Sequence, residues 1–593
     1  MIVYFYKNIK THQLLVCLFL MVLCGCKKDK ATTNISPIKQ YQSTYLKHLN
    51  ASINYLDTIV SSTSRTKFQE NYVKARQHFK HIEAVFAFVD KENYKTINAP
   101  NILKIEEEDA TDIKINNPFG FQVIEEAVYE DTIDTVQLKK IVLKTKNRLQ
   151  LIAENTNLRL KDYHVLWVIR DQIARIALTS ISGFDSPVLQ SLKESSLAYQ
   201  GVLDVLEVFE GKFKSKTVYQ NFKSEIEASQ NLLNSSDFET FDRYSFIKNH
   251  AHKQLELLQA IKKDWSVDFP LELAFNNDMT SLFSNTTFNL DFFADLPHAD
   301  TLQLQKQQLG KVLFNDTRLS KDNSMSCASC HHKNKAFTDG LKVFPNQKRN
   351  SPTLLYAAYQ QSFFYDGRTG NLEGQIVDVV NNKAEFHSDL DNLTKVIKTD
   401  STYVNTFNTL FRDGVNQQNI RNSIAAYVRS LGDFNSKFDL NINGKENTLT
   451  TQEINGFNLF MGKAKCATCH FPPVFNGTVP PIFTETELEL LGVPKDTINN
   501  VIDTDLGRYN VFNTPQRQHF FKTPTIRNIS KTAPYMHNGV YTTLEQVMTF
   551  YNNGGGAGLK MDLEYQTLPS DSLQLSNREI KAVISFMKTL DDR

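Results

Sequence analysis

Apolar residues recur at helical spacing through the first half of the chain. Leu166, Ile169 and Ile173 fall on one helical face, and similar stripes recur over 35–265 without the alternation that a strand would show. This pattern predicts a helical domain over 35–265. The stretch "FNNDMTSLFSNTTFN" that follows is rich in Asn, Ser and Thr and is typical of a linker, which we place at 266–288.

The second half of the chain carries one local plan twice. The segments "LQLQKQQLGKVLF" and "TQEINGFNLFMGKAK" each predict a helix that leads into a cysteine motif, and stretches rich in Gly, Pro and Asn follow both motifs. The closing stretch "LSNREIKAVISFMKTL" has a Glu three residues after an N-cap Ser, which indicates a last helix. The sequence therefore predicts a mainly α chain, in which two further domains at 289–445 and 446–593 follow the helical domain.

The overall composition gives no reason to expect a nucleic-acid partner. The 593 residues carry 66 Lys and Arg against 65 Asp and Glu, a formal net charge of +1, and 41% of them are hydrophobic. These values are typical of a folded globular protein with several domains. Long blocks of like charge are also absent from the sequence.

The N-terminus has the pattern of an export signal. Lys7 and Lys10 precede the apolar run "LLVCLFLMVL", which is too short to span a bilayer comfortably and ends in "LCGC". Small residues just before a cysteine resemble a bacterial lipoprotein signal, so we expect a signal peptide over 1–26 and a lipid on Cys26. A plain secretory signal with an incidental cysteine is the alternative. We expect an exported periplasmic or cell-envelope lipoprotein that touches the membrane only through this lipid.

The remaining cysteines form two pairs of the form Cys-x-x-Cys, each followed directly by histidine. They are Cys327, Cys330 and His331 in "CASCH", and Cys466, Cys469 and His470 in "CATCH". This is the attachment pattern of c-type haem, in which both thiols bond to the porphyrin and the histidine binds the iron. One zinc site would need all ligands to converge, but the two pairs lie about 135 residues apart. The sequence thus predicts two covalently bound haem c groups, one in each of the two C-terminal domains.

Several ordered motifs around these cysteines carry a resemblance to a known family. They are "LGKVLFNDTRLS", "KRNSPTLL", "FFYDGR", "GKAKCATCH", "FKTPTIRNISKTAPYMHNG" and "TLEQV". Over about 290–593 the chain resembles the bacterial dihaem cytochrome c peroxidases, together with the related methylamine-utilisation dihaem enzyme. The resemblance implies that hydrogen peroxide reacts at the first haem. It also implies that the second haem passes on electrons from a small donor protein of the cytochrome c or cupredoxin type.

The resemblance also implies roles for individual residues. The family's active-site glutamate lies eighteen residues after the glycine of its Asp-Gly-Arg motif, and counting from Gly367 gives Glu385. A carboxyl group there would move a proton between the two peroxide oxygens. Without the resemblance, this Glu in a polar run would be interpreted as a solvated surface residue.

A calcium ion between the haem domains is a second feature that the resemblance implies. The matching positions are Asn350, Thr532 and Pro534. Amide and carbonyl oxygens suit a hard cation such as calcium. Considered alone, the three residues would be interpreted as turn formers.

The axial ligands depart from the peroxidase pattern. Many members have a histidine that caps the first iron, but the corresponding loop here, "DGLKVFPNQK", has none. The first haem should therefore be five-coordinate or water-bound at rest. For the second haem, the family's distal ligand lies fourteen residues after His537, which is Tyr551, and Met536 and Met548 compete for this role. The methylamine-type enzyme also has tyrosine there.

Aromatic residues in the haem half differ from the family as well. Tyr365 stands where the family usually has a tryptophan between the haems, so it is the candidate inter-haem relay. The two tryptophans of the chain lie before residue 266, which weakens the case for methylamine-type chemistry. The leading function is a dihaem peroxidase; the alternatives are a methylamine-type oxidase that modifies a partner protein through high-valent haem, and a non-catalytic electron-transfer cytochrome.

The helical half has a weaker resemblance of its own. The stretch "NPFGFQVIEEAVYED" is similar to the Gly-x-His-x-x-Glu motif of imelysin-like helical domains. Gly120 and Glu125 match this motif, but the expected histidine is Gln122, which puts metal binding through the motif in doubt. A helical interaction or spacer domain is the alternative. Upstream, His81 and Glu83 are open to interpretation as ligands or as an exposed face.

Overall fold

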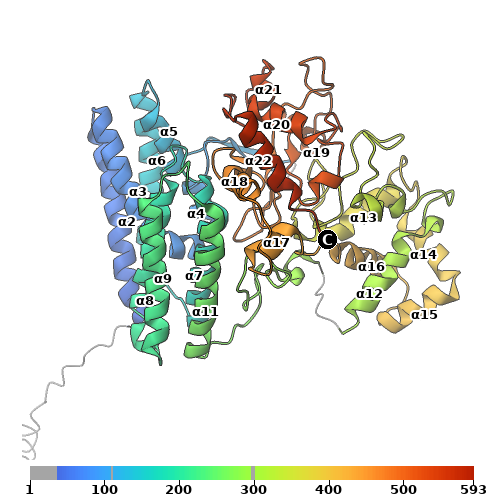
Figure 1. Ribbon diagram of the computed structural model, residues 1–593, viewed down its shortest axis with the longest axis horizontal. Helices are drawn as coiled ribbons and strands as arrows, with labels where there is room; N and C mark the ends of the chain where they lie inside the picture. The colour runs from blue at the N-terminus through green and yellow to red at the C-terminus, as the bar shows by residue number, and fades with distance from the viewer. Residues whose placement is uncertain (1–35, 108–110, 296–300) are drawn as a thin grey trace, which may run out of the picture.

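The computed structural model describes residues 36–107, 111–295 and 301–593 (Figure 1). The expected signal peptide and Cys26 lie outside these residues. Within the described part, no helix combines the length and the apolar character needed to cross a membrane. The prediction of a mainly α chain is confirmed, because helices dominate the fold and the strands are few and short.

The N-terminal helices stand together at one side of the molecule, blue to green in Figure 1. Their bounds are α2 (Pro37–Ser61), α3 (Arg65–Val89), α4 (Lys91–Ile97), α5 (Phe121–Tyr129), α6 (Thr135–Asn155), α7 (Asp162–Leu178), α8 (Ser191–Glu207), α9 (Lys216–Ser235), α10 (Arg243–Phe246) and α11 (His252–Trp265). Apolar spacing explains the packing. On α2, for example, Tyr41, Tyr45 and Leu49 recur at every fourth residue and are all buried.

A small hairpin connects α4 to α5. Strand β1 (Lys104–Glu106) pairs antiparallel with β2 (Lys114–Asn116), and Ile105 lies opposite Ile115.

The stretch that we expected to be a linker is packed into the core. Phe275 and Phe288 form an antiparallel bridge, and both rings lie 5.1 Å from the ring of Phe483, measured between centroids. Phe283, in the same stretch, is also fully buried. This stretch therefore packs the N-terminal helices against the C-terminal part of the chain.

The C-terminal half is built from shorter helices and long connections. Its helices are α12 (Gln303–Phe314), α13 (Leu372–Asn381), α14 (Leu390–Lys398), α15 (Ser401–Leu410), α16 (Gln417–Arg429), α17 (Lys437–Ile442), α18 (Thr451–Met461), α19 (Tyr509–Phe512), α20 (Leu544–Asn552), α21 (Gly555–Gly558) and α22 (Asn577–Lys588). The short strands β3 (Leu488–Glu489) and β4 (Phe521–Lys522) pair antiparallel.

The duplicated plan of the sequence is repeated in the helix packing. Helix α12 precedes the first cysteine motif and packs on α16, and α18 precedes the second motif and packs on α22. In each pair a glycine lies against the partner backbone. A Cβ at Gly310 would lie 1.8 Å from the Ser423 carbonyl oxygen, and one at Gly456 would lie 2.0 Å from that of Ala582. Only glycine allows this close approach.

The hydrophobic cores follow a different division. Helices α12–α16 surround a core of their own, whereas the N-terminal helices share one continuous core with the segment that contains α17, α18 and α22. In Figure 1 these last helices lie between the N-terminal helices and α12–α16.

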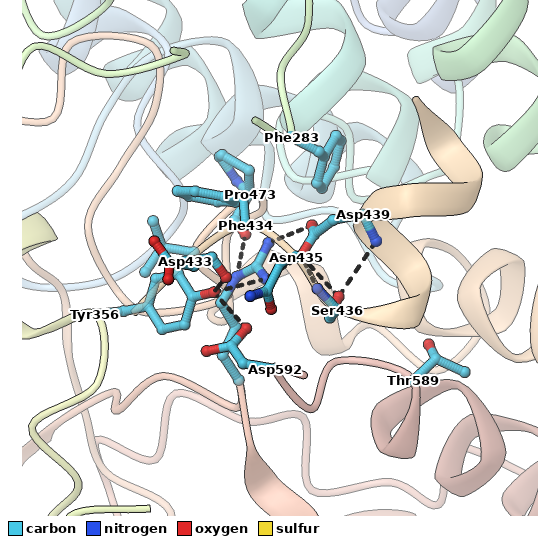
Figure 2. Close-up of polar contacts among 12 residues, drawn as sticks. Phe283, Tyr356, Asp433, Phe434, Asn435, Ser436, Asp439, Pro473, Thr589 and Asp592 are labelled. Atoms are coloured by element: carbon cyan, nitrogen blue, oxygen red, sulfur yellow. Dashed lines mark hydrogen bonds and ion pairs between the residues drawn. The ribbon is translucent and has the colours of Figure 1, made fainter. Parts of the chain in front are cut away.

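A buried ion pair lies in the shared core (Figure 2). Arg527 donates to Asp439 through Nη1 at 2.8 Å and Nη2 at 2.9 Å, and both side chains are fully buried. The Nε atom of Arg527 donates to the Pro473 carbonyl oxygen at 2.9 Å, and Tyr356 Oη lies 3.3 Å from Nη1. Tyr356 in turn donates to Asp592 Oδ1 at 2.7 Å. One cluster thus joins distant segments of the C-terminal half.

Candidate haem and peroxide site

One cavity of about 2290 Å³ passes between the segments of the C-terminal half and the N-terminal helices. Its walls include nearly all the site residues that the sequence predicted. These are Cys330, His331, Asn350, Tyr365, Glu385, Cys466, Cys469, His470, Thr532, Pro534 and Tyr551. Cys327 is not part of this wall and lies in the 3₁₀ turn Cys327–Ser329.

The first cysteine motif is wound so that its histidine projects from a tight turn. The backbone N–H groups of Cys330 and His331 both donate to the Cys327 carbonyl oxygen, at 3.3 and 3.1 Å. The Nδ1 atom of His331 lies 2.9 Å from the Phe337 carbonyl oxygen. Because only a protonated Nδ1 can donate to a carbonyl, Nε2 keeps its lone pair for a metal.

The second motif repeats this geometry. It begins with the 3₁₀ turn Cys466–Thr468, and the His470 N–H donates to the Cys466 carbonyl oxygen at 2.9 Å. The Nδ1 atom of His470 lies 3.0 Å from the Pro524 carbonyl oxygen and 3.3 Å from that of Phe475. Carbonyl acceptors therefore fix the tautomer of both histidines.

These two donor sets fit covalently attached haem. All four cysteines have free thiols, although Cys-x-x-Cys spacing would permit a disulfide. Each pair stands beside an imidazole whose Nε2 is free for iron, at the wall of a large cavity. The thiols would therefore hold haem through thioether bonds, and the two imidazoles would bind its iron through Nε2.

Glu385 is a half-buried carboxyl on the first-motif side of the cavity. The Asn382 side chain donates to its Oε1 at 2.8 Å. Burial raises the pKa of Glu385, and the hydrogen bond from Asn382 opposes this shift. Burial also raises the pKa of Cys330 to about 12, with a contribution from the negative charge of Glu385. The carboxyl group therefore lies close to the first pair of thiols.

Tyr551 occupies the corresponding region near the second motif. It lies on α20, and burial raises its pKa, followed by the charges of Cys469 and Cys466. The competing candidates Met536 and Met548 also line the cavity. All three potential ligands thus line the cavity, and Tyr551 interacts with the second pair of cysteines.

The residues expected to bind calcium are only partly free to do so. The Asn350 N–H donates to the His537 carbonyl oxygen at 2.7 Å, which places Asn350 beside the segment that contains Thr532 and Pro534. Its Oδ1, the expected ligand atom, accepts a long hydrogen bond of 3.4 Å from Tyr365 Oη. Asn350 therefore also orients the candidate inter-haem tyrosine.

Charged residues that the sequence did not single out organise the space around Tyr365. Arg349 donates to Asp366 Oδ2 at 2.7 Å and to Asp505 Oδ1 at 2.9 Å. Arg508 donates to the carbonyl oxygens of Asp366 and Gly367, at 3.1 and 2.7 Å. In the sequence, Arg349 and Asp366 lay only in the quoted motifs "KRNSPTLL" and "FFYDGR", and nothing pointed to Asp505 and Arg508, which lie more than a hundred residues from these partners.

The N-terminal helical region contributes to the same cavity. The Glu107 carboxylate accepts from Arg508 Nε at 2.8 Å, across 401 residues of sequence. Phe184 packs edge-on against Phe471, the residue after His470, with ring centroids 5.2 Å apart. The region therefore closes one side of the cavity near the second motif.

Comparisons with known proteins agree with this geometry. Residues 304–447 match the family model for "Di-haem cytochrome c peroxidase". Cytochrome-c peroxidase IdrP2 of Denitromonas iodatirespirans is 33% identical over 316 residues, which cover 84% of that protein and 50% of this chain. The chain belongs to the dihaem cytochrome c peroxidase family.

Other members of this dihaem peroxidase family are similar over the same share of the chain. Methylamine utilization protein MauG of Methylophilus methylotrophus is 31% identical over 310 residues, which cover 85% of that protein and 50% of this chain. The solved structure of a MauG-like protein is 25% identical to this chain, with a TM-score of 0.44. The match covers 50% of this chain and 92% of that protein. Family membership makes the chain a haem-dependent oxidoreductase of the peroxidase type and implies two haem c groups.

Proposed function

We propose that this dihaem peroxidase reduces hydrogen peroxide to water with electrons from a small periplasmic redox protein of the cytochrome c or cupredoxin type. The observation that supports this most strongly is the single cavity that both cysteine motifs share with Glu385. The expected lipoprotein signal supports a place in the periplasm or cell envelope, with Cys26 as the lipid anchor.

His331 and Glu385 would have different roles at the first site. His331 would bind the first iron through Nε2, since Nδ1 is held by the Phe337 carbonyl oxygen. Bound haem would supply the iron that reduces peroxide there and, at the second site, an acceptor for donor electrons. Glu385 would move the proton from one peroxide oxygen to the other. Burial supports this role, because a raised pKa brings the carboxyl group closer to the ambient pH.

The first iron would be uncapped at rest. The "DGLKVFPNQK" loop has no histidine. Two further histidines of the cavity wall already have partners: His519 Nδ1 lies 2.9 Å from the Asp505 carbonyl oxygen and His537 Nε2 lies 3.3 Å from Asp503 Oδ1. A high-spin ferric signal from one haem of the oxidised protein is the expected spectroscopic result, and two low-spin signals would contradict it.

The test of the peroxidase proposal is steady-state peroxide consumption with a reduced small cytochrome as donor. We expect His331→Ala to retain covalent haem in part and to lose turnover, because the first iron loses its axial ligand. His332→Ala is the matched control: the neighbouring imidazole is also half-buried, but it has no proposed role at the iron. Full turnover in His331→Ala would show that peroxide reacts elsewhere.

Oxidation of a partner protein is the second candidate function. The position of Tyr551 beside the second pair of thiols favours it, because the methylamine-type enzyme has tyrosine at this position. Against it, Trp167 and Trp265 are both buried in the N-terminal helical region. Peroxide turnover with a small redox donor supports the first candidate, and peroxide-dependent modification of a protein without such turnover supports the second.

We also propose a calcium site at Asn350, Thr532 and Pro534, and haem domains at 289–445 and 446–593. The cavity wall contains all three residues, and Asn350 is bonded to the segment that carries the other two. Asn350 Oδ1 accepts one long hydrogen bond from Tyr365 Oη, and its second lone pair would be available to calcium. Loss of activity on chelation that added calcium restores is the expected outcome, and full activity in the chelated protein would exclude an essential site.

A further inference from the structure

Three helices bring three histidines and an aspartate together outside the haem cavity. His48 lies on α2, His78 and His81 lie on α3, and Asp204 lies on α8. All four side chains are half-buried, and none of them lines the haem cavity. The cluster is therefore a separate feature of the N-terminal helical region, and neither the peroxidase chemistry nor the imelysin-like motif accounts for it.

The four side chains contact one another directly. His48 Nδ1 lies 3.0 Å from His78 Nδ1, and the rings of His48 and His81 are stacked with centroids 4.3 Å apart. His81 Nδ1 lies 3.4 Å from Asp204 Oδ2. One potential ligand atom from each of His48, His81 and Asp204 can be chosen so that all three lie within 4.8 Å of one another.

Close packing of α3 against α8 brings Asp204 to the imidazoles. A Cβ at Gly201 would lie 2.1 Å from the His81 carbonyl oxygen, so the two helix backbones touch at this point. Asp204 follows Gly201 by three residues and lies on the same face of α8. His78 and His81 are likewise three residues apart on α3. The sequence spacing on both helices therefore directs these groups to one point.

The surroundings favour a bound cation over a simple network of hydrogen bonds. Gln200 donates to Asp204 Oδ1 at 2.9 Å, which leaves Oδ2 toward His81. Among the described residues, Asp204 has no ion pair with a lysine or arginine. A carboxylate without a lysine or arginine partner thus lies beside two stacked imidazoles, and these groups are a donor set that a transition-metal cation can hold.

We propose that His48, His81 and Asp204 bind one divalent transition-metal ion of the zinc class. Two imidazoles and a carboxylate suit such an ion, with water as a fourth ligand. His78 would act as a positioning residue, because its hydrogen bond with His48 Nδ1 leaves His48 Nε2 for the metal. Ligand atoms around tetrahedral zinc lie about 3.3 Å apart, so side-chain rotation must draw the three groups closer together.

Zinc titration of the full-length haem-containing protein by calorimetry, after removal of metals with a chelator, tests the proposal. Elemental analysis then gives zinc per haem iron. We expect one zinc per chain, and an affinity weaker by roughly 100-fold or more in His81→Gln and in Asp204→Asn. His78→Gln should weaken binding by roughly 10–100-fold, as the loss of an outer partner does.

A matched control is available in the same helical region. His250 Nδ1 lies 2.7 Å from Glu225 Oε1, a contact between one imidazole and one carboxylate without a second histidine. His250→Gln should leave the zinc affinity and stoichiometry unchanged. Circular dichroism and the haem absorption of each variant establish that it is folded.

Two results would overturn the proposal. One is a wild-type protein that binds no zinc. The other is zinc binding that folded His81→Gln and Asp204→Asn retain at wild-type affinity, because the metal would then bind elsewhere. If one of these variants fails to fold, the zinc affinity of the other tests the proposal, since the two residues lie on different helices.

Discussion

His331 and His470 show how a local backbone arrangement prepares a residue for its role. Each imidazole follows a 3₁₀ turn and contacts a carbonyl oxygen through Nδ1. The same arrangement on two separate segments leaves Nε2 of each imidazole available, although the His470 ring is also held by Pro524, 54 residues further along the chain. The chemical difference between the two sites must then come from the surrounding residues, Glu385 on one side and Tyr551 on the other.

Glu385→Gln tests the first of these differences. The amide can replace the carboxylate in the contact with Asn382, but it cannot carry a proton between oxygens. We expect both haems and the fold to be retained, and peroxide turnover to slow by roughly 10²–10⁴-fold. Stopped-flow mixing with peroxide measures this step. The exposed neighbour Lys383, changed to Ala, is the control, and wild-type turnover in Glu385→Gln would remove this carboxyl from the mechanism.

Residues differ in how far the sequence alone could identify them. The cysteine motifs were predictable because covalent attachment to haem fixes their spacing. The role proposed for Glu385 rests on the family resemblance, since nothing local distinguishes it from a surface glutamate. His48, His78 and Asp204 gave no signal, because helix packing alone brings them together. Glu83 is buried against Lys80 and Gln172, so an exposed face is the wrong interpretation for this residue.

At the scale of elements, apolar spacing and capping residues predicted helices, but the short strands were not predicted. Helix α22 (Asn577–Lys588) begins after Ser576, and Glu579 completes the capping box that the sequence predicted. The hairpin of β1 and β2 was missed, because strands of three residues are set by their pairing rather than by a periodic pattern. Polar residues made 266–288 resemble a linker, but the phenylalanines between them determine its burial.

Helix α5 (Phe121–Tyr129) carries a prediction about pH. Glu125 on this helix is fully buried, accepts from Ser186 Oγ at 3.0 Å through Oε1, and has no partner at Oε2 among the described residues. Burial, and then the charge of Glu194, raise the pKa of Glu125 to about 8. Gln122, where the imelysin-like motif has histidine, donates to the Asn98 carbonyl oxygen at 2.7 Å. The motif here is therefore part of the helix packing.

The raised pKa determines how stability changes with pH. In the unfolded chain Glu125 loses its proton near its ordinary pKa of about 4.3, but in the folded chain it keeps the proton up to about pH 8. Its contribution to stability is thus present below about pH 4 and is lost progressively up to about pH 8. Glu125→Gln cannot ionise, so we expect the variant to gain thermal stability relative to the wild type between about pH 5 and pH 8.

Thermal unfolding at several pH values measures this gain. Glu130→Gln, at the exposed end of the same helix, is the matched control. A difference between Glu125→Gln and the wild type that stays constant with pH would show that Glu125 is ionised in the folded protein at neutral pH.

At the scale of the whole molecule, polar links connect segments that lie far apart in the sequence. Glu107 of the N-terminal region contacts Arg508, and Arg508 holds the backbone at Asp366 and Gly367 beside Tyr365. Apolar periodicity contains no information about such links, because each partner is locally an ordinary surface charge. The N-terminal helices therefore contribute to the shape of the haem cavity, although the sequence placed them in a separate domain.

The ion pair of Arg527 and Asp439 gives the prediction at this scale (Figure 2). Both side chains are fully buried, so removing one charge leaves the other without its counter-charge and without water. We expect Asp439→Asn to destabilise the protein by about 3–5 kcal/mol, the usual cost of breaking a buried pair. The loss should reach both haem segments together, because Arg527 also contacts Tyr356 on one side and the Pro473 carbonyl oxygen on the other.

Unfolding followed by circular dichroism and by haem absorption checks this expectation. The exposed pair of Arg593 and Glu446 is also doubly bonded, and it is half in solvent. Glu446→Gln should therefore change the unfolding midpoint very little, since water replaces the lost contact. If Asp439→Asn unfolds as late as Glu446→Gln, water must reach Arg527, and apolar packing alone would hold the two haem segments together. If the two signals separate in Asp439→Asn, each segment has stability of its own and this cluster is what couples them.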